Sequence, residues 1–262
     1  MKYPVTITVP MYKETMTPLE QISFRQLRNI LGHYRTVVIK PASLNIDKLL
    51  AENPNITAES FDDSYFKGVS GYNRLMMSEE LYRRFEDSEY ILVYQLDAYV
   101  FRDELKAWCD RGYDYIGAPW LPRPIHKFPL MRLSSWIKKV YCEKIGKPDN
   151  NMIRFKVGNG GFSLRKTASH LKAVTELRKM IEFYSANSDS DTVYNEDVFF
   201  SIEVNRHGMG FTYPEWEEAL GFSFDIHPET CYRQNGYKLP FGCHGWSKWK
   251  TRKFWSPFIP QN

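Results

Sequence analysis

The sequence predicts an α/β protein whose mixed, mostly parallel sheet is flanked by helices within a single domain. Strand-like and helix-like stretches alternate over residues 4–120, which is typical of a doubly wound sheet. The stretch at 90–96 (YILVYQL) is apolar almost throughout, so we expect a strand that is buried on both faces. No segment has the composition of a linker, and a chain of 262 residues suits one large domain, here residues 1–262.

The elements of the first half follow from local patterns. β-Branched residues predict strands at 5–9 and 36–40, the second of which ends at Pro41. Apolar residues at helical spacing predict helices at 17–31 and 71–85. A polar loop is expected between the second strand and the helix at 71–85. The apolar strand at 90–96 then completes this half.

The second half begins with a segment of different character. Over residues 121–148 there are four prolines and seven Lys or Arg residues against one acid, Glu143. We therefore predict an insertion or flap at 121–150 within the domain. The core pattern resumes at Phe155, and apolar spacing predicts a helix at 167–184.

Composition limits the classes of partner and compartment. A net charge of +4 is too small to favour a nucleic-acid binder, whereas an aromatic content of 16% suits sugar faces, nucleobases or membrane interfaces. The four cysteines lack the spacing of metal ligands, so we expect reduced thiols. No apolar run approaches the ~18 to 20 residues that span a bilayer, and the first ten residues resemble a strand. We expect a cytoplasmic protein.

Asp97 is the first candidate functional residue, because it directly follows the apolar strand. An acid at that point would lie in the crevice at the carboxyl edge of the sheet, where α/β proteins bind ligands. Carboxylates at such positions hold divalent metals or ribose hydroxyls. The alternative is a solvated aspartate that ends the strand.

A glycine-rich segment at 158–165 (GNGGFSLR) is the second candidate. Gly160 and Gly161 allow the backbone to approach a ligand closely, and Asn159 offers both a donor and an acceptor to a polyhydroxylated partner. The segment is not a phosphate-binding P-loop, because no Gly-Lys-Ser/Thr follows at the required spacing. A tight glycine turn without a ligand is the alternative.

Two further motifs carry ionisable side chains. Glu196 and Asp197 stand at the expected start of a helix, where acids also stabilise the helix dipole without any further role. His244 lies among small residues (FGCHGW), as access to a ligand or metal would require, although a lone histidine is often structural. Joint ligation with Cys243 is not expected, because adjacent residues of an extended segment point in opposite directions.

The motifs YQLDAYVF, YIGAPW, VGNGGFSLR, NEDVFF and CHGW, in this order, resemble a bacterial family of GT-A-type glycosyltransferases found among surface-polysaccharide genes. The resemblance covers roughly residues 72–246. It implies a GT-A-like, Rossmann-related fold. It also implies transfer of a hexose such as galactose from a nucleotide sugar, UDP-linked, to a saccharide or lipid-linked acceptor in polysaccharide synthesis, for example of a capsule.

The resemblance also implies roles for individual residues. Asp197, with Glu196 beside it, would be the base of an inverting transfer. The donor nucleotide sugar would be bound by residues from several motifs: Pro10, Tyr12, Lys13, Asn73, Arg74, Asp97, Asn159, Gly160 and Gly161. Tyr12 would stack on the base.

The implied cofactor is a divalent metal ion, Mn²⁺ or Mg²⁺, held by Asp97 and His244. The family usually has a second acid two residues after the first, and Tyr99 stands there in this sequence. Two phosphate oxygens could complete the coordination of a hard ion. Alternatively, basic residues neutralise the diphosphate without a metal.

Functions of two other classes remain open from sequence. One is a non-catalytic protein that binds carbohydrate or nucleotide sugar through an aromatic pocket. The other is a metal-dependent hydrolase built from Asp97, Asp197 and His244, although such sites usually contain more histidines at metal-ligand spacing.

Two basic, aromatic segments predict peripheral contact with the inner face of the cell membrane. One is the insertion at 121–148. The other is the tail at 244–255, which has no acid and contains Lys248, Lys250, Arg252, Lys253, Trp246, Trp249, Phe254 and Trp255. Lysine and arginine favour anionic leaflets, and tryptophan favours the headgroup region. A solvated basic surface, or cations reserved for the donor phosphates, is the alternative.

Overall fold

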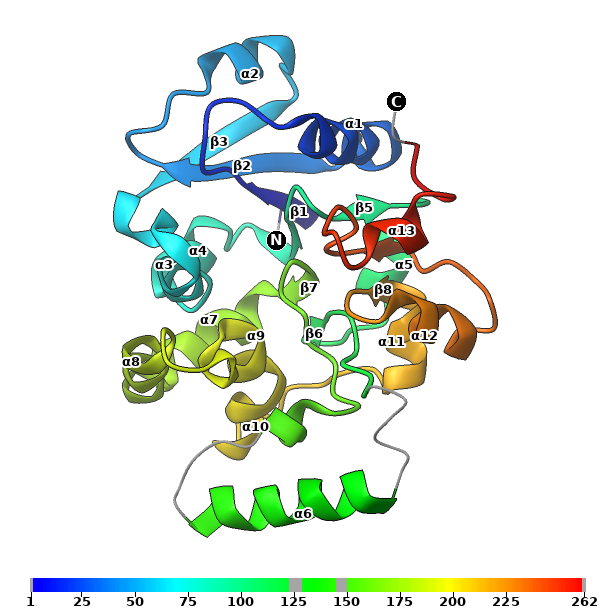
Figure 1. Ribbon diagram of the computed structural model, residues 1–262. Coiled ribbons are helices and arrows are strands. Elements are labelled where there is room, and N and C mark those ends of the chain that lie inside the picture. The colour runs from blue at the N-terminus through cyan, green and yellow to red at the C-terminus, as the bar shows by residue number, and fades with distance from the viewer. Residues whose placement is uncertain (1, 123–128, 145–149, 261–262) are drawn as a thin grey trace.

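A six-stranded mixed sheet forms the centre of the protein in the computed structural model, which describes residues 2–122, 129–144 and 150–260 (Figure 1). The strand order is β3-β2-β1-β4-β7-β6, with β1 parallel to β2 and β4, β2 parallel to β3, and β7 antiparallel to β4 and β6. The strands are β1 (Tyr3–Pro10), β2 (Arg35–Pro41), β3 (Ile56–Phe61), β4 (Ser88–Tyr94), β6 (Tyr115–Ile116) and β7 (Phe162–Lys166). The predicted mixed, mostly parallel sheet is confirmed.

Helices pack on both faces of this sheet. The main helices are α1 (Pro18–Leu31), α2 (Asp47–Glu52), α3 (Gly68–Met76), α4 (Glu79–Arg84), α5 (Leu105–Cys109), α6 (Pro129–Lys144), α7 (Thr167–Glu176), α8 (Arg178–Asn187), α11 (Trp216–Phe222), α12 (Pro228–Gln234) and α13 (Arg252–Trp255). A continuous helical run comprises α9 (Glu196–Val198), a π-helical turn (Phe199–Glu203) and α10 (Val204–Arg206). Short 3₁₀ turns occupy Asp63–Phe66, Asn150–Ile153 and Thr192–Tyr194.

The strand β4 is buried on both faces, as its apolar sequence predicts. Tyr90, Leu92 and Tyr94 join the cluster under α1 and α5, whereas Ile91 and Val93 join the cluster under α3, α4 and α7. Side chains of a strand alternate between faces, so a strand between two helical layers must be apolar at every position. This strand places its carboxyl end, and the residues that follow, at the centre of the molecule.

Three predicted elements differ from the structure. The expected polar loop before residue 71 contains α2 and β3, which pairs along β2. The expected helix at 71–85 is two helices, because Ser78 caps a new one by accepting a hydrogen bond from the Leu81 N–H at 3.1 Å. The expected helix at 167–184 likewise breaks at Leu177 between α7 and α8.

A second, three-stranded sheet brings together residues that are far apart in sequence. Its strands are β5 (Tyr99–Val100), β9 (Gly242–Cys243) and β8 (Ser223–Phe224), in that order. Asp97 lies two residues before β5, Asp225 directly follows β8, and His244 directly follows β9. The pairing of these short strands therefore places three ionisable side chains next to one another.

The tail differs from its predicted role as an aromatic membrane segment. Trp246 and Trp255 are fully buried in a cluster with β8 and β9, where they cannot reach a headgroup region. Trp249, in contrast, is 83% exposed. The rings of Trp246 and Trp255 form much of the hydrophobic core beside the short strands β8 and β9. The number of aromatic residues in the tail does not tell buried rings from exposed ones.

The predicted insertion at 121–150 contains α6, and its residues 123–128 and 145–149 lie outside the described ranges. The four cysteines are free and buried, as expected for reduced thiols. Within the described ranges, no helix is long and apolar enough to cross a membrane.

Candidate active site

Two adjoining cavities open where β1 and β4 end. The smaller, about 280 Å³, is lined by the segment after β1 and the segment after β4, including Pro10, Tyr12, Lys13, Gln95 and Asp97. The larger, about 650 Å³, shares Tyr12 and Gln95 with it. Its other lining residues include Tyr72, Asn73, Asn159, Gly160, Gly161, Asn195, Glu196, Asp197, His244 and Lys248. Every predicted site residue except Arg74 therefore lines one of two connected cavities.

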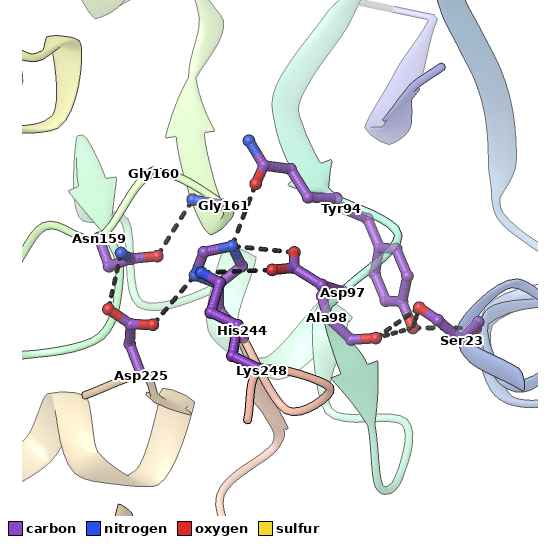
Figure 2. Close-up of polar contacts among 12 residues, drawn as sticks. Ser23, Tyr94, Asp97, Ala98, Asn159, Gly160, Gly161, Asp225, His244 and Lys248 are labelled. Atoms are coloured by element: carbon purple, nitrogen blue, oxygen red, sulfur yellow. Dashed lines mark hydrogen bonds and ion pairs between the residues drawn. The ribbon is translucent and has the colours of Figure 1, made fainter. Parts of the chain in front are cut away.

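His244 joins two carboxylates across the three-stranded sheet (Figure 2). Its Nε2 lies 3.0 Å from Asp97 Oδ1, and its Nδ1 lies 3.1 Å from Asp225 Oδ1. Nε2 is also 3.0 Å from Oε1 of Gln95. Burial alone would lower the pKa of His244, but the two carboxylates outweigh it and raise that pKa to about 9. Both ring nitrogens therefore donate hydrogen bonds at neutral pH.

Asp97 is held in the ionised form by cations on both of its oxygens. Besides His244, the Lys248 ammonium lies 3.3 Å from Asp97 Oδ2. Burial tends to raise the pKa of Asp97, yet the His244 and Lys248 charges hold it well below its usual range. The carboxylate keeps 25% of its side chain exposed, so it can reach a ligand in the cavity.

The His244 environment fits that of a metal ligand. Metal-binding histidines usually donate their second N–H to a carboxylate, as His244 does to Asp225, and a carboxylate oxygen stands beside the other nitrogen. The Nε2 proton would have to leave on metal binding. Among the residues that the structure describes, no three His, Cys, Asp or Glu side chains form a metal-holding group. A metal ion held by Asp97 and His244 would therefore need further ligands from a bound molecule.

The glycine-rich segment is tight because charged side chains pack directly against it. A Cβ on Gly161 would overlap the His244 ring, and one on Gly160 would overlap the Glu196 carboxylate. Asn159 fixes the turn, since its side chain accepts from the Gly161 N–H at 3.1 Å and donates to Asp225 at 2.9 Å. These glycines thus allow the two ionisable clusters to approach the same loop from opposite sides.

Glu196 is buried and paired with Arg165 behind the larger cavity. The Arg165 side chain is 0% exposed and its Nη2 lies 2.9 Å from Glu196 Oε2. Arg165 also donates to the Tyr82 hydroxyl at 3.2 Å and to Ser163 at 3.1 Å. Buried ions survive in proteins when paired and hydrogen-bonded in this way. The pair fixes the start of the helical run on which the next residue, Asp197, lies.

Asp197 is the half-buried acid of the pair, and it faces the larger cavity. Burial, and then the neighbouring Glu196 charge, raises the pKa of Asp197 from 3.8 to about 8. One of its oxygens accepts from the Val198 N–H at 2.8 Å. A carboxylate with a pKa near neutral can both accept and release a proton under ordinary conditions.

Asn73 and Arg74 differ in position although they are neighbours in sequence. The buried Asn73 donates to Asn195 at 3.0 Å and accepts from the Glu196 N–H at 3.3 Å, so it anchors the segment before Asp197. Arg74 instead donates to the Ser64 carbonyl and lines a separate cavity with Glu79 and Arg178. The structure does not bring Arg74 together with the other predicted residues.

The segment after β1 forms the outer wall of the site. Tyr12 is 47% exposed, and its ring centroid lies 5.6 Å from that of Phe66. Lys13 pairs with Glu20 at 3.2 Å, which holds this wall against the start of α1. An exposed ring in this position can stack on a flat ligand.

Three contributors to the site escaped the sequence reasoning: Gln95, Asp225 and Arg165. Lys248 entered it only through the alternative that the tail cations serve the donor phosphates. Asp225 follows a mostly apolar run at 219–224 (ALGFSF), so the signal that found Asp97 could have found it too. Arg165 lies in the buried strand β7, and an arginine in a buried strand indicates a paired charge. Gln95 and Lys248 carry no such local signal.

Solved structures that superpose on this one include glycosyltransferases. The galactosyltransferase LgtC, solved with donor and acceptor sugar analogues, superposes with a TM-score of 0.57 at 14% identity, over 95% of this chain and 93% of that one. Mouse xyloside xylosyltransferase 1 superposes with a TM-score of 0.56 at 12% identity, over 95% and 98% of the two chains. The protein therefore has the GT-A fold that the sequence predicts.

The chain belongs to the family DUF5672, described as a protein of unknown function, whose model matches residues 55–244. None of the curated proteins matches it. The matched range includes Asp97, the glycine-rich segment, Asp197 and His244, and it ends at the last of these.

Proposed function

We propose that the protein is a glycosyltransferase that moves a hexose from a nucleotide sugar to an acceptor hydroxyl. The observation that carries the proposal is the pair of connected cavities with two acids in opposite electrostatic states. Asp97 is kept ionised by His244 and Lys248, whereas Asp197 has its pKa raised to about 8. Two acids whose pKa values are driven apart are typical of a site that needs one fixed charge and one proton carrier.

The donor side of this reaction must stabilise a departing diphosphate. Lys248 and His244 bring positive charge to the junction of the two cavities, and Tyr12 offers a ring for the base. Pro10 and Lys13 would line the nucleoside, and Asn159, Gly160 and Gly161 the donor sugar. UDP is the nucleotide we propose, and galactose the sugar to be tested first.

A divalent ion, Mn²⁺ or Mg²⁺, is part of the proposal, held by Asp97 and His244. When bound, it would supply positive charge to the leaving diphosphate. Asp225 would orient the His244 ring through Nδ1, and Lys248 would remain as an additional cation beside Asp97. Since His244 is protonated at neutral pH, the ion must compete with a proton, so its affinity should rise with pH.

Asp197 would act as the general base of an inverting displacement. The acceptor oxygen attacks the anomeric carbon, the bond from that carbon to the diphosphate oxygen breaks, and the acceptor proton passes to an Asp197 oxygen. The Arg165–Glu196 pair and Asn73 hold Asp197 in place for this step. The proposed acceptor is a saccharide, free or attached to a lipid diphosphate, in surface-polysaccharide synthesis.

The test is a screen of the full chain with nucleotide sugars, with and without Mn²⁺. We expect a UDP-hexose to raise the melting temperature and, when an acceptor saccharide is added, to release UDP with formation of an inverted glycoside. With Mn²⁺ present, Asp97→Asn should lose most of this donor response. Asp110→Asn, an exposed acid paired with Lys106 at the end of α5, is the matched control and should keep it.

Three outcomes would contradict the proposal in different ways. Donor binding without turnover in any acceptor screen favours the non-catalytic binding protein. Cleavage of simple phosphoesters in preference to nucleotide sugars favours the metal-dependent hydrolase. Transfer with retained anomeric configuration would leave the transferase in place but remove Asp197 as the base of a single displacement.

A further inference from the structure

The helix α6 presents an apolar stripe to solvent. Leu133, Trp136, Ile137 and Tyr141 are 54%, 62%, 55% and 62% exposed, and their spacing places them on one face of the helix. Cys142, about half a turn away from that face, is buried. The large apolar residues of this stripe are therefore exposed to solvent, and the helix itself lies at the edge of the molecule (Figure 1).

The charge of α6 indicates what covers this stripe. The helix has four basic residues, Arg132, Lys138, Lys139 and Lys144, against one acid, Glu143. A basic helix with tryptophan, leucine and isoleucine on one face is typical of helices that lie in the surface of an anionic bilayer. With 16 residues it is too short to cross the hydrocarbon layer, so it would lie in the interface plane.

We propose that α6 docks the protein on an anionic lipid surface, with Leu133, Trp136, Ile137 and Tyr141 inserted among the headgroups. A second copy of the same face is the less favourable occupant, because pairing would bring two strongly basic helices together. The tail is not needed for this contact, since Trp246 and Trp255 are buried and Lys248 pairs with Asp97.

Docking depends on the exposed stripe and its charge, and it does not require the proposed transferase activity. The benefit of docking for the choice of acceptor rests on the proposed function. A protein held at a bilayer surface could reach an acceptor sugar that is carried on a lipid, which favours the lipid-linked acceptor over a free saccharide.

Vesicle flotation tests the proposal with the full chain. We expect flotation with phosphatidylglycerol-containing vesicles at low salt, little flotation with pure phosphatidylcholine vesicles, and loss of binding as salt screens the charges. Trp136→Ser with Ile137→Ser should weaken partitioning by about tenfold or more, because two inserted side chains are lost. Trp249→Ser, which removes an even more exposed tryptophan from the tail, is the matched control and should bind normally.

Two further measurements keep the result unambiguous. Lys139→Glu with Lys144→Glu should weaken binding to anionic vesicles without altering the melting temperature, and UDP release with a soluble acceptor should be unchanged in all these variants. Absence of flotation at low salt, or equal flotation of the stripe variant, overturns the proposal. So does a dimer without lipid that the stripe variant converts to a monomer. Flotation by a protein without transferase activity would leave docking intact and remove the proposed function alone.

Discussion

The site contains two acids that the fold treats in opposite ways. Asp97 and Asp197 line connected cavities, but cations surround the first, and a buried carboxylate adjoins the second. The pKa of Asp97 therefore falls well below its usual range, while burial and Glu196 raise the pKa of Asp197 to about 8. The difference shows that neighbours, and not residue type, set the pKa of a carboxylate. Under the proposed function, the first environment suits charge stabilisation and the second suits proton transfer.

The origin of the difference lies in where each neighbour comes from. The cations beside Asp97, His244 and Lys248, both follow β9, about 150 residues further along the chain, and the pairing of β5 with β9 brings them close. The charge beside Asp197 belongs to the preceding residue, Glu196, which is buried and paired with Arg165. The environment of Asp97 thus depends on contacts between distant segments. The environment of Asp197 depends on its neighbour in sequence, Glu196, and on the buried Arg165.

The largest expected effect is on turnover, from Asp197→Asn. The amide has the same shape but cannot accept the acceptor proton, and loss of a general base costs about 10² to 10⁴ in rate. Nucleotide affinity should stay within a few-fold, as measured by titration calorimetry alongside initial rates. Glu196→Gln is the informative partner: if it lowers turnover as much while the fold stays stable, the two acids do not have the separate roles assigned to them.

A large effect on stability is expected from Arg165→Met. This change leaves Glu196 buried without its cation, which should lower the free energy of unfolding by roughly 3 to 5 kcal/mol. The double variant with Glu196→Gln should recover most of that loss, because no buried charge then remains. Urea unfolding of the two single variants and the double variant measures the coupling. Additive losses would mean that the pair does not interact in the folded protein.

An intermediate effect on binding is expected from Asp97→Asn. With Mn²⁺ present, loss of a ligand should weaken UDP binding by roughly 10- to 100-fold. Without metal, affinity should be unchanged or higher, because the substitution frees Lys248 and removes a negative charge near the diphosphate. Calorimetry in both conditions separates the two ways of neutralising the diphosphate. Tighter binding in both would favour basic residues alone.

Local patterns predicted the fold and many of the residues that line the two cavities, and they failed where contacts between distant segments decide the structure. The strand at 90–96, the helix capped at Thr17 and the acid after β4 depend on sequence neighbours, and the structure contains them. The sequence pattern did not predict β3, because its residues are largely polar. The segment forms a strand by pairing along β2. Asp225 and Gln95 belong to the site because they contact His244, which is distant in sequence from Gln95. The burial of Trp246 and Trp255 depends on tertiary packing, which the number of aromatic residues does not reveal.

The most diagnostic effect is the pH dependence that Asp197 imposes. Its folded pKa of about 8 lies above the ordinary 3.8, so the folded protein binds more protons than the unfolded chain between those values. The stabilising contribution of this group is complete below about pH 4 and is lost as pH rises through 8, by at most about 1.4 kcal/mol per pH unit. A base must be deprotonated to act, so kcat/KM should instead rise with pH and level off above about 8.

Activity and stability are thus expected to move in opposite directions over the same pH range. Initial rates and urea unfolding of the nucleotide-free protein, each followed from about pH 5 to pH 9, measure the two trends. Asp197→Asn should flatten the stability trend, whereas the control Asp110→Asn should leave it as in the natural sequence. A rate profile that is already flat above about pH 5 would mean that the acid accepting the proton has an ordinary pKa. That acid would then not be Asp197, whose pKa is raised in this environment.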